Sequence, residues 1–498
     1  MNGFRARVLA FLSFSVFAFS SAAATAPAAA DASGSATLTI SGPFGTVPLV
    51  SFEGEEAISS PFLFKAEIAG DAGHPIAFDS VLGQEVTIAL TATPGAPRHF
   101  SGMCSSIAET FTNRRLLYQI NIVPRLWRLS ENAQSRIFQR KSVPEILQRV
   151  LIDHGIVFQS ALARAYAPRE FVVQYRETDF NFISRLMEEE GIFYFFTHEQ
   201  AGHTMVIGDS PGVHPALAAG AQFLPAVQHG PAGGVTEWTK AQDLRPGKVT
   251  LWDHNFQLPD KNLEFSASIQ PTVAVGQVTH HLDLAATSDL EIYDFPGGYA
   301  KRFDGVGVAG IFSAGPVAAS TRIQELAANA IVIDGTSSLP HFVSGSKFTL
   351  AQHPNANGDY LLTRVHHSSQ GGRRGLKSDY QNTFTCIPSS LPFRPKRLAT
   401  RPVIAGTQLA VVTGPPGEQI FKDQLGRVKV QFFWDRQGTN DQNSSMWVRV
   451  ASLHAGLENG FLTVPRVGQE VVVAFLEGDP DQPIIVGSAY GPTRLPPE

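Results

Sequence analysis

Short runs in which apolar and polar residues alternate recur along most of this chain, and turn-forming residues separate them. In the first 125 residues these runs lie at 37–40, 48–52, 62–68, 86–90 and 117–123. Neighbouring side chains of a strand point to opposite faces, so an alternation of period two is typical of strands with one buried face. Many short strands separated by turns predict an antiparallel sandwich or barrel.

Two stretches with helical signals interrupt this pattern. The first follows Ser142 and Glu145, which have the spacing of a capping box, and it closes at 154–155. The second is predicted to begin at Thr178 and to stop at Gly191. Its apolar residues share one helical face: Phe180, Ile183, Leu186 and Met187.

The middle of the chain is less regular. The stretch 208–247 is rich in Ala, Gly and Pro and is predicted to be a long irregular connection. A third helix is predicted at 321–331, where apolar residues recur at helical spacing. Further strands are predicted at 248–252, 265–269, 347–351 and 360–366.

The last part of the chain has the clearest all-β pattern. Segment 388–402 contains four prolines beside four basic residues without apolar periodicity, so it is predicted to be a linker. Behind it, five short strands are predicted at 408–412, 428–433, 446–450, 470–476 and 484–488. Five strands in about 90 residues suit a small closed barrel of the OB type, which makes 403–498 a separate domain.

Charge and cysteine content exclude several classes of function. The net charge is −5, from 44 acidic and 39 basic residues without long runs, so no electrostatic footprint for nucleic acid is present. The two cysteines, Cys104 and Cys386, are too few for a disulfide framework or a four-cysteine zinc site. We expect buried free thiols, with a single bridge between them as the alternative.

Residues 1–30 have the pattern of a secretory signal peptide. Arg5 and Arg7 precede the apolar run 8–19, which an alanine-rich stretch of small residues follows. The run is shorter than the roughly 20 apolar residues that a spanning helix needs. The alternative is an N-terminal extension that arises from a start site assigned too far upstream.

Specific strings then point to one family. The strings 423–430, 433–435, 444–450 and 465–483 resemble the OB domain of VgrG, the spike protein of the type VI secretion system. Upstream, 51–59, 176–182, 189–194 and 293–299 resemble the hub module of the same family. The resemblance covers about residues 37–492.

The resemblance implies a mainly β fold with a few helices. Two related β-barrel hub domains with helical insertions would occupy 37–387 and be similar to the tail hub of contractile phages, and the C-terminal OB barrel would be the base of the spike. It further implies a structural component without catalytic residues, cofactor or metal, which forms the tube tip that punctures target membranes and delivers effectors. Its implied partners are two more copies of the chain in a homotrimer, an Hcp tube ring, and a PAAR-type tip protein or an effector.

This sequence differs from the family pattern at both ends. It ends at Glu498, directly after the OB unit, where the family continues into a trimeric β-helix needle, so we expect a hub and OB portion without the needle. The family is assembled in the cytoplasm and leaves through the contractile apparatus, with only transient contact with the target membrane. If the signal-like segment is real, the protein is instead exported to the periplasm.

Three groups of residues could carry chemistry. Ser210 lies in a G-x-S-x-G string, but Pro211 lacks the N–H that an oxyanion hole needs, so a turn is favoured over a hydrolase elbow. The pairs 280–281 and 366–367 are adjacent histidines, which point to opposite faces of a strand, so a metal would need ligands such as His353 or Asp359 from elsewhere.

The remaining candidates are charged or aromatic. Glutamates 188–190 occupy the last helical turn, where the helix dipole disfavours negative charge, so we expect a solvated helix end. Phe432, Phe433 and Trp434 alternate in direction, and acidic residues surround the nearby basic ones, which disfavours binding of single-stranded nucleic acid. The functional alternatives to a spike component are an exported β-rich protein that binds surface glycans and a hydrolase built on Ser210.

Overall fold

The computed structural model describes residues 36–496 apart from 72, 93–96, 113, 225–232, 288, 371–378, 457–458 and 492–494. The signal-like segment 1–30 therefore lies outside the described residues. All strands and helices predicted from the sequence fall within the described part of the chain.

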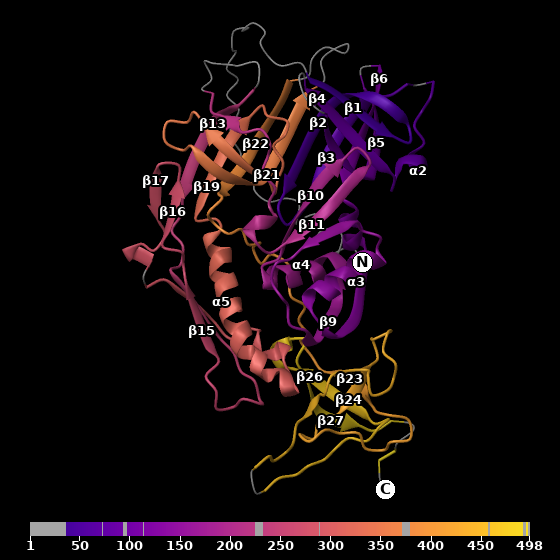
Figure 1. Cartoon of the computed structure of the whole chain (residues 1–498). Helices are drawn as coiled ribbons and strands as arrows, with labels where there is room; N and C mark the ends of the chain where they lie inside the picture. Colours follow the sequence, from indigo (N-terminus) through magenta and orange to yellow (C-terminus); the bar gives the residue numbers. More distant parts are fainter. Residues whose placement is uncertain are drawn as a thin grey trace. The chain divides into compact units, whose positions relative to one another are not determined.

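Six antiparallel strands close a first barrel, drawn in indigo and purple in Figure 1. They are β1 (Ala36–Gly42), β2 (Gly45–Ala57), β3 (Ser60–Ala69), β4 (Glu85–Ala92), β5 (Arg98–Thr112) and β6 (Arg115–Val123). The order is β1-β4-β5-β6-β3-β2, and β1 also pairs with β2, which closes the ring. The alternating pattern places Phe52, Phe62, Phe64 and Phe100 inside it, each at most 1% exposed. All five strands predicted here are confirmed, and β5 is added to them.

A second ring of six strands follows. Its members are β12 (Ala221–Gln222), β13 (Val235–Gln242), β19 (Ile331–Ser337), β20 (Lys347–Ala351), β21 (Gly358–Gln370) and β22 (Asp379–Pro388). The order is β13-β19-β22-β21-β20-β12, and a bridge between Phe223 and Val235 brings the chain after β12 back to β13. Strand β21 also pairs with β2, so both barrels share one continuous sheet. The prediction of two hub barrels is confirmed.

Strand β13 corrects the prediction that 208–247 is irregular throughout. Its sequence alternates weakly, because exposed polar residues fill one face and only Trp238 contributes a large ring to the other. The strand forms because all of it pairs with β19, and because Trp238 packs against Tyr360 and Phe384. Tertiary pairing here outweighs the weak local signal.

The helices are α2 (Phe78–Val81), α3 (Val143–Asp153), α4 (Asp179–Glu190) and α5 (Ile311–Ala327). Helix α3 has the predicted capping box, and α4 begins after its cap Thr178 and ends at Gly191 in the left-handed region. Helix α5 begins ten residues before the predicted start. Gly315 and Pro316 hide the helical period, and Gly315 is needed because a Cβ there would lie 2.1 Å from the Phe265 ring.

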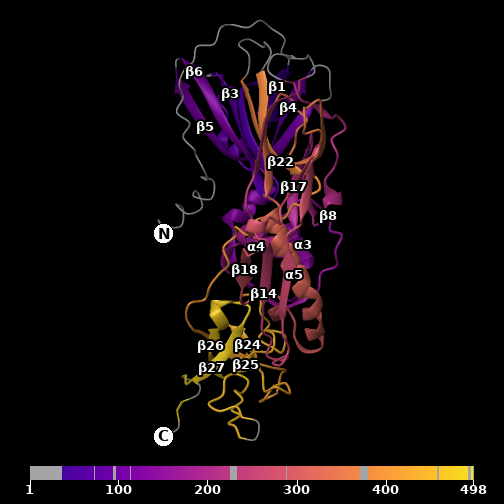
Figure 2. The ribbon, with the colours of Figure 1, turned by 90° about the vertical axis from the view of Figure 1, so that its left-hand side faces the viewer.

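Four small sheets accompany these helices. They comprise β7 (Ala133–Lys141) with β9 (Arg169–Thr178); β8 (Phe158–Ala161) with β10 (Phe193–Glu199) and β11 (Gly202–Gly208); β14 (Lys248–Trp252) with β15 (Glu264–Ser268) and β18 (Glu291–Asp294); and β16 (Thr272–Val275) with β17 (Val278–His281). Figure 2 shows α3, α4, α5, β14 and β18 grouped together. The strands predicted at 248–252 and 265–269 are thus confirmed.

The C-terminal strands form a closed five-stranded barrel, drawn in yellow in Figure 1. They are β23 (Gln408–Thr413), β24 (Lys429–Phe432), β25 (Arg449–Val450), β26 (Glu470–Phe475) and β27 (Pro483–Ala489). The order is β24-β23-β26-β27-β25, and a bridge between Val428 and Val448 joins its two ends. The OB barrel predicted from the sequence is confirmed.

Candidate functional site

The end of helix α4 is the centre of a dense charge network. Glutamates 188–190 were expected to form a solvated helix end, and this is wrong: the Glu189 and Glu190 side chains are only 12% and 11% exposed. Arginines from three other segments surround them. These cations offset both the burial of the carboxylates and the unfavourable helix dipole at this end of α4.

Glu189 joins three segments of the chain. Its carboxylate accepts from Arg169 of β9 at 2.8 Å and from Arg401 of segment 388–402 at 2.5 Å, and Arg302 lies 3.9 Å away. Burial by itself would raise the pKa of Glu189, but these arginines hold that pKa well below its usual range. Glu189 therefore stays ionised.

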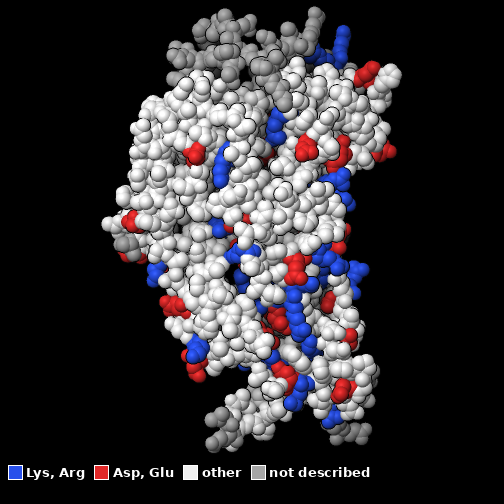
Figure 3. Space-filling view, viewed as in Figure 1, with Lys and Arg blue, Asp and Glu red and all other residues white. Residues whose placement is uncertain are grey.

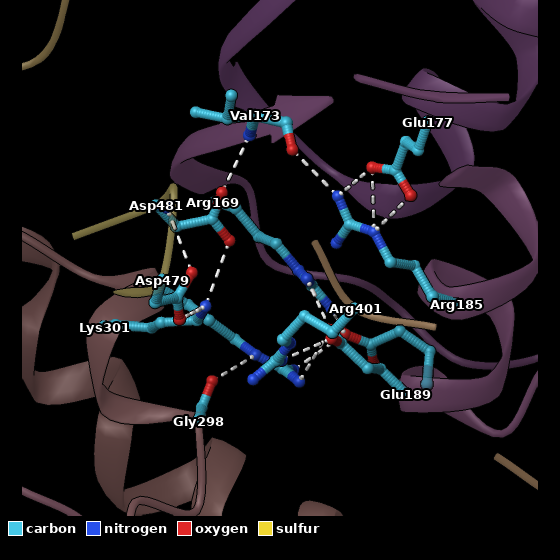
Figure 4. Close-up of polar contacts among 12 residues, drawn as sticks. Arg169, Val173, Glu177, Arg185, Glu189, Gly298, Lys301, Arg401, Asp479 and Asp481 are labelled. Carbon is cyan, nitrogen blue, oxygen red and sulfur yellow. Dashed lines mark hydrogen bonds and ion pairs between the residues drawn. The ribbon is translucent and has the colours of Figure 1, made fainter. Parts of the chain in front are cut away.

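Glu190 has a similar set of partners. Arg169 donates to it at 2.6 Å, Arg302 at 2.7 Å and Arg164 at 2.8 Å. Burial opposes ionisation here as well, yet the arginines lower the pKa of Glu190 to about 2. The two glutamates and their four arginines form one compact ionic cluster, here called the Glu189 cluster, part of which Figure 4 shows.

A second ionic contact links the hub to the OB barrel. Lys301 lies in the short 3-10 helix η4 (Ala300–Arg302) and binds Asp479 and Asp481 of the OB barrel, the latter at 3.0 Å. All three side chains are at most 12% exposed. Burial tends to raise the pKa of Asp479, but Lys301 and Arg401 lower it. Because Arg401 also binds Glu189, its charge acts on both the Lys301 contact and the Glu189 cluster.

Backbone atoms of β9 complete the same junction. Asp481 accepts from the Val173 N–H at 2.7 Å, and the Val173 carbonyl accepts from Arg185 at 2.8 Å. Arg185 in turn binds Glu177 at 2.8 Å. Figure 4 shows this continuous path from α4 through β9 to the OB loop.

The hub and the OB barrel also share an apolar core. Phe171 and Val173 of β9 are buried at 4% and 1% exposure in the same cluster as Ala410, Val430 and Val471 of the OB strands. The antiparallel pair β7–β9 therefore covers one side of the barrel. The core of the OB unit is completed by residues more than 200 positions upstream.

Segment 388–402 lies bound along the hub. Arg394 donates to the carbonyls of Gly191 and Asp209 at 2.9 and 2.6 Å, and Glu188 accepts from the backbone N–H groups of Leu398 and Ala399, both at 3.0 Å. Burial raises the pKa of Glu188 to about 7. Segment 388–402, predicted to be a linker, is thus held against the hub by hydrogen bonds that its composition does not indicate.

A further charged contact links the OB barrel to the hub. Nη1 of Arg427 in the OB barrel donates to both carboxylate oxygens of Asp304 at 2.9 Å, and Nε of Arg427 binds Asp423 at 2.6 Å. Hydrogen bonds between charged partners are stronger than those between neutral groups. Together with the Lys301 contact, this pair gives the OB barrel a second charged attachment to the hub.

Most of the charged groups in these contacts are buried. Figure 3 shows that charged side chains on the visible face gather over the region of α3, α4 and β9, while the face over the two barrels is largely uncharged. Separating the partners of such a network would leave buried charges uncompensated, so the network resists displacement of the segments that it joins. The strings 189–194 and 465–483 stand out in the sequence, but no local pattern indicates that both belong to one junction, because their partners are far apart in the chain.

Ser210 does not lie in a hydrolase elbow. Strand β11 ends at Gly208, and a short 3-10 helix (Pro211–Val213) follows where an elbow needs a long helix. The neighbouring Asp209 carboxylate accepts from the Ala163 and Arg164 N–H groups and from the Tyr166 hydroxyl. Asp209 is therefore committed to holding a turn.

The histidine pairs point to opposite faces, as predicted for strands. His367 is fully buried and binds Glu56 and Tyr380, whereas His366 faces outward towards Glu53 at 3.7 Å. Among the described residues, no cluster of three His, Cys, Asp or Glu side chains has a metal-binding arrangement. His353 accepts backbone N–H groups of its own loop.

The other side-chain candidates are also placed. Phe432 is buried and stacks on Trp434, with ring centroids 5.2 Å apart, whereas Phe433 is 63% exposed, so the three rings form no common platform. Cys104 and Cys386 are buried free thiols, in line with the first of the two alternatives.

Comparison with known families matches both parts of the chain. Residues 55–372 match the family described as phage tail baseplate hub (GPD). Residues 419–490 match the family described as the type VI secretion system/phage-baseplate injector OB domain. The stretch between the two matches, residues 373–418, contains segment 388–402.

Curated relatives are similar along most of the chain. The type VI secretion system spike proteins VgrG1b and VgrG1a of Pseudomonas aeruginosa are each 34% identical, over 92% and 90% of this chain. The matches cover 61% and 68% of those relatives. The chain thus spans about three fifths of the length of VgrG1b.

Two solved structures have a similar fold. The E. coli c3393 protein, described as a type VI secretion component similar to the T4 phage tail proteins gp27 and gp5, has a TM-score of 0.61 at 21% identity. The alignment covers 89% of this chain and 96% of that one. A chain of the Francisella PdpA-VgrG complex also has a TM-score of 0.61, at 10% identity over 93% of this chain and 79% of that one.

Proposed function

The chain belongs to the VgrG family of type VI secretion system spike proteins, and on that premise we propose that it forms the hub and the OB base of such a spike. In this role it is a structural component of the tube tip, which carries effectors and opens target membranes. The observation that carries the proposal is the buried junction of Lys301 with Asp479 and Asp481, reinforced by the Glu189 cluster. A tip that is driven into a membrane needs its hub and spike base fixed to each other.

Assembly follows from the same premise. Three copies would associate through their hubs, stand on an Hcp tube ring, and carry a PAAR-type protein or an effector. The protein would leave the cell through the apparatus after assembly in the cytoplasm. The domains we propose are a hub at 37–387, a connecting segment at 388–402 and a spike base at 403–498.

We propose that this component has no catalytic activity of its own. Support comes from Asp209, which is fully engaged beside Ser210, and from Pro211, which cannot donate to an oxyanion. The use of the buried charges as ion pairs between segments also favours a mechanical role. Surface-glycan binding has no specific observation in its favour.

The experiment is reconstitution with an Hcp ring. The polypeptide 36–498 is mixed with purified Hcp and analysed by sedimentation velocity and negative-stain electron microscopy. We expect a complex of three copies on one ring. Lys301→Met should weaken the complex or loosen its tip, while Lys261→Met, at an exposed loop position, serves as the matched control. A chain that never associates with Hcp, although folded, would contradict the proposal.

A further inference from the structure

The tip of hairpin β10–β11 is docked on the first barrel. The Ser101 hydroxyl donates to the Glu199 carbonyl, and the Thr87 hydroxyl donates to the Gln200 carbonyl at 3.3 Å. His198 and His203 face each other across the hairpin. Both rings turn into the barrel, where their centroids lie 4.8 and 5.4 Å from that of Phe62.

His203 binds the barrel as a hydrogen-bond acceptor. The Arg125 N–H donates to its Nε2 at 3.1 Å, and its Nδ1 is buried without a hydrogen-bond partner among the described residues. An imidazole nitrogen accepts only when it carries no proton. Protonation of this ring would therefore set two N–H groups against each other.

His198 makes a related contact on the other strand. Its Nδ1 accepts from the Ser101 N–H at 3.2 Å, which leaves the proton on Nε2, 3.9 Å from Oε2 of Glu56. Nδ1 also lies 3.1 Å from the Ser101 carbonyl, so a protonated His198 would keep one partner. His203 is consequently the more sensitive of the two.

The charges that face the two rings can compensate a new positive charge only at His198, where Oε2 of Glu56 has no hydrogen-bond partner among the described residues and lies 3.9 Å from Nε2. Glu85 on β4 is already paired with Arg125 at 2.6 Å. Glu56 on β2 binds His367 of β21 at 3.1 Å and lies 3.5 Å from Arg98 of β5.

The titration of the rings agrees with this geometry. Burial lowers the pKa of both His198 and His203, and in each case a nearby arginine lowers it further: Arg98 for His198 and Arg125 for His203. Glu85 acts in the opposite direction on His203 but does not reverse the shift.

We propose that His203 and His198 form a proton-sensitive clasp, which holds hairpin β10–β11 on the first barrel while both rings are neutral and releases it in acid. The hairpin follows directly after Gly191, so its release would loosen the chain beside the Glu189 cluster. The clasp is distinct from the ion pairs of the junction, which mildly acidic conditions leave intact.

Hydrogen exchange measured by mass spectrometry tests the clasp between pH 7.5 and 5. The measured quantity is the equilibrium constant for opening of segment 193–208, after correction for the intrinsic exchange rate. If both histidines take up a proton on opening, this constant should rise by up to about 100-fold for each pH unit that the pH falls below about 6.5. His203→Gln keeps an acceptor near the Arg125 N–H but cannot be protonated, so its slope should fall to about tenfold. His281→Gln, at a side chain that is 67% exposed, is the control and should match the wild type.

Two results would overturn the proposal. Equal slopes in the wild type and in His203→Gln would show that His203 takes up no proton on opening. If the variant does not fold, the wild type alone tests the proposal. Exchange that becomes faster in acid in segment 193–208 but not in the α3 segment 143–153 supports the clasp. A parallel increase in both segments overturns it.

Discussion

The ammonium group of Lys301 lies 3.0 Å from Oδ2 of Asp481, which is 180 positions further along the chain. Asp481 also binds the Val173 N–H, so one carboxylate connects η4, β9 and the OB barrel. The hub and the OB barrel are therefore joined by a buried carboxylate as well as by the connecting segment.

Replacing Lys301 with Met should destabilise the folded protein strongly. The change leaves Asp479 and Asp481 buried without their cation, and breaking a buried ion pair in this way costs about 3–5 kcal/mol. Urea unfolding of the wild type, Lys301→Met and the exposed control Lys261→Met measures the effect. Equal midpoints for all three would show that the junction contributes nothing to stability.

The shared core predicts that a hub residue controls the stability of the OB barrel. Phe171→Ala opens a cavity under the barrel, and such truncations cost about 3–5 kcal/mol. Amide exchange in β23 and β26 should become faster, while that in β3 and β6 should remain as in the wild type. The isolated fragment 403–498 should melt cooperatively, since its strands close on themselves, but at a lower temperature than in the whole chain. Unchanged exchange in β23 would contradict the shared core.

Local signals predicted some elements well, and distant contacts decided the others. The capping box at Ser142 and the stop at Gly191 each depend on only a few neighbouring residues. The start of α3 and the end of α4 could therefore be predicted from the sequence. Strand β13 and the first half of α5 depend on tertiary pairing and on the close approach of Phe265 to Gly315, which no local pattern reveals. For the same reason, the burial of Glu189 by Arg169 and Arg401 could not be read from the helix alone.

The raised pKa of Glu188 predicts a stability change between pH 4.5 and 7. Because its folded pKa is about 7, the folded state retains a proton that the unfolded state loses near 4.5. This favourable contribution is complete below pH 4.5 and is lost as the pH rises through 7. Glu188→Gln keeps an acceptor for the backbone of Leu398 and Ala399, so at pH 8 it should be more stable than the wild type by roughly 2–3 kcal/mol.

Chemical denaturation at pH 4.5 and at pH 8 checks this prediction. The two proteins should have similar stability at the lower pH and differ at the higher one. Glu418→Gln, at an exposed OB position, is a suitable control with no expected difference. A variant that is less stable than the wild type at pH 8 would show that the ionised carboxylate is needed there.

Ser210→Ala should leave both stability and hydrolysis unchanged. The serine precedes Pro211 in a short 3-10 turn, so it lacks the backbone donor that stabilises an oxyanion. Hydrolysis of p-nitrophenyl acetate by both proteins should equal the buffer background. A rate that is above background in the wild type and lost in the variant would establish a hydrolase.

Assembly of the polypeptide 36–498 should depend on its concentration. In the trimer that the family resemblance implies, a needle of three intertwined chains adds to the contacts between hubs, and this polypeptide carries only hub and OB surfaces. Obligate interfaces bury about 2,000 Å² or more, so losing a large share of the contact should replace a fixed trimer with an equilibrium. Sedimentation equilibrium over an about 1,000-fold range of protein concentration should therefore find monomer at the lowest concentrations and a growing trimer fraction at the highest. Addition of an Hcp ring should shift the equilibrium towards the trimer. A trimer that persists at the greatest dilution would mean that the hub contacts suffice without the needle.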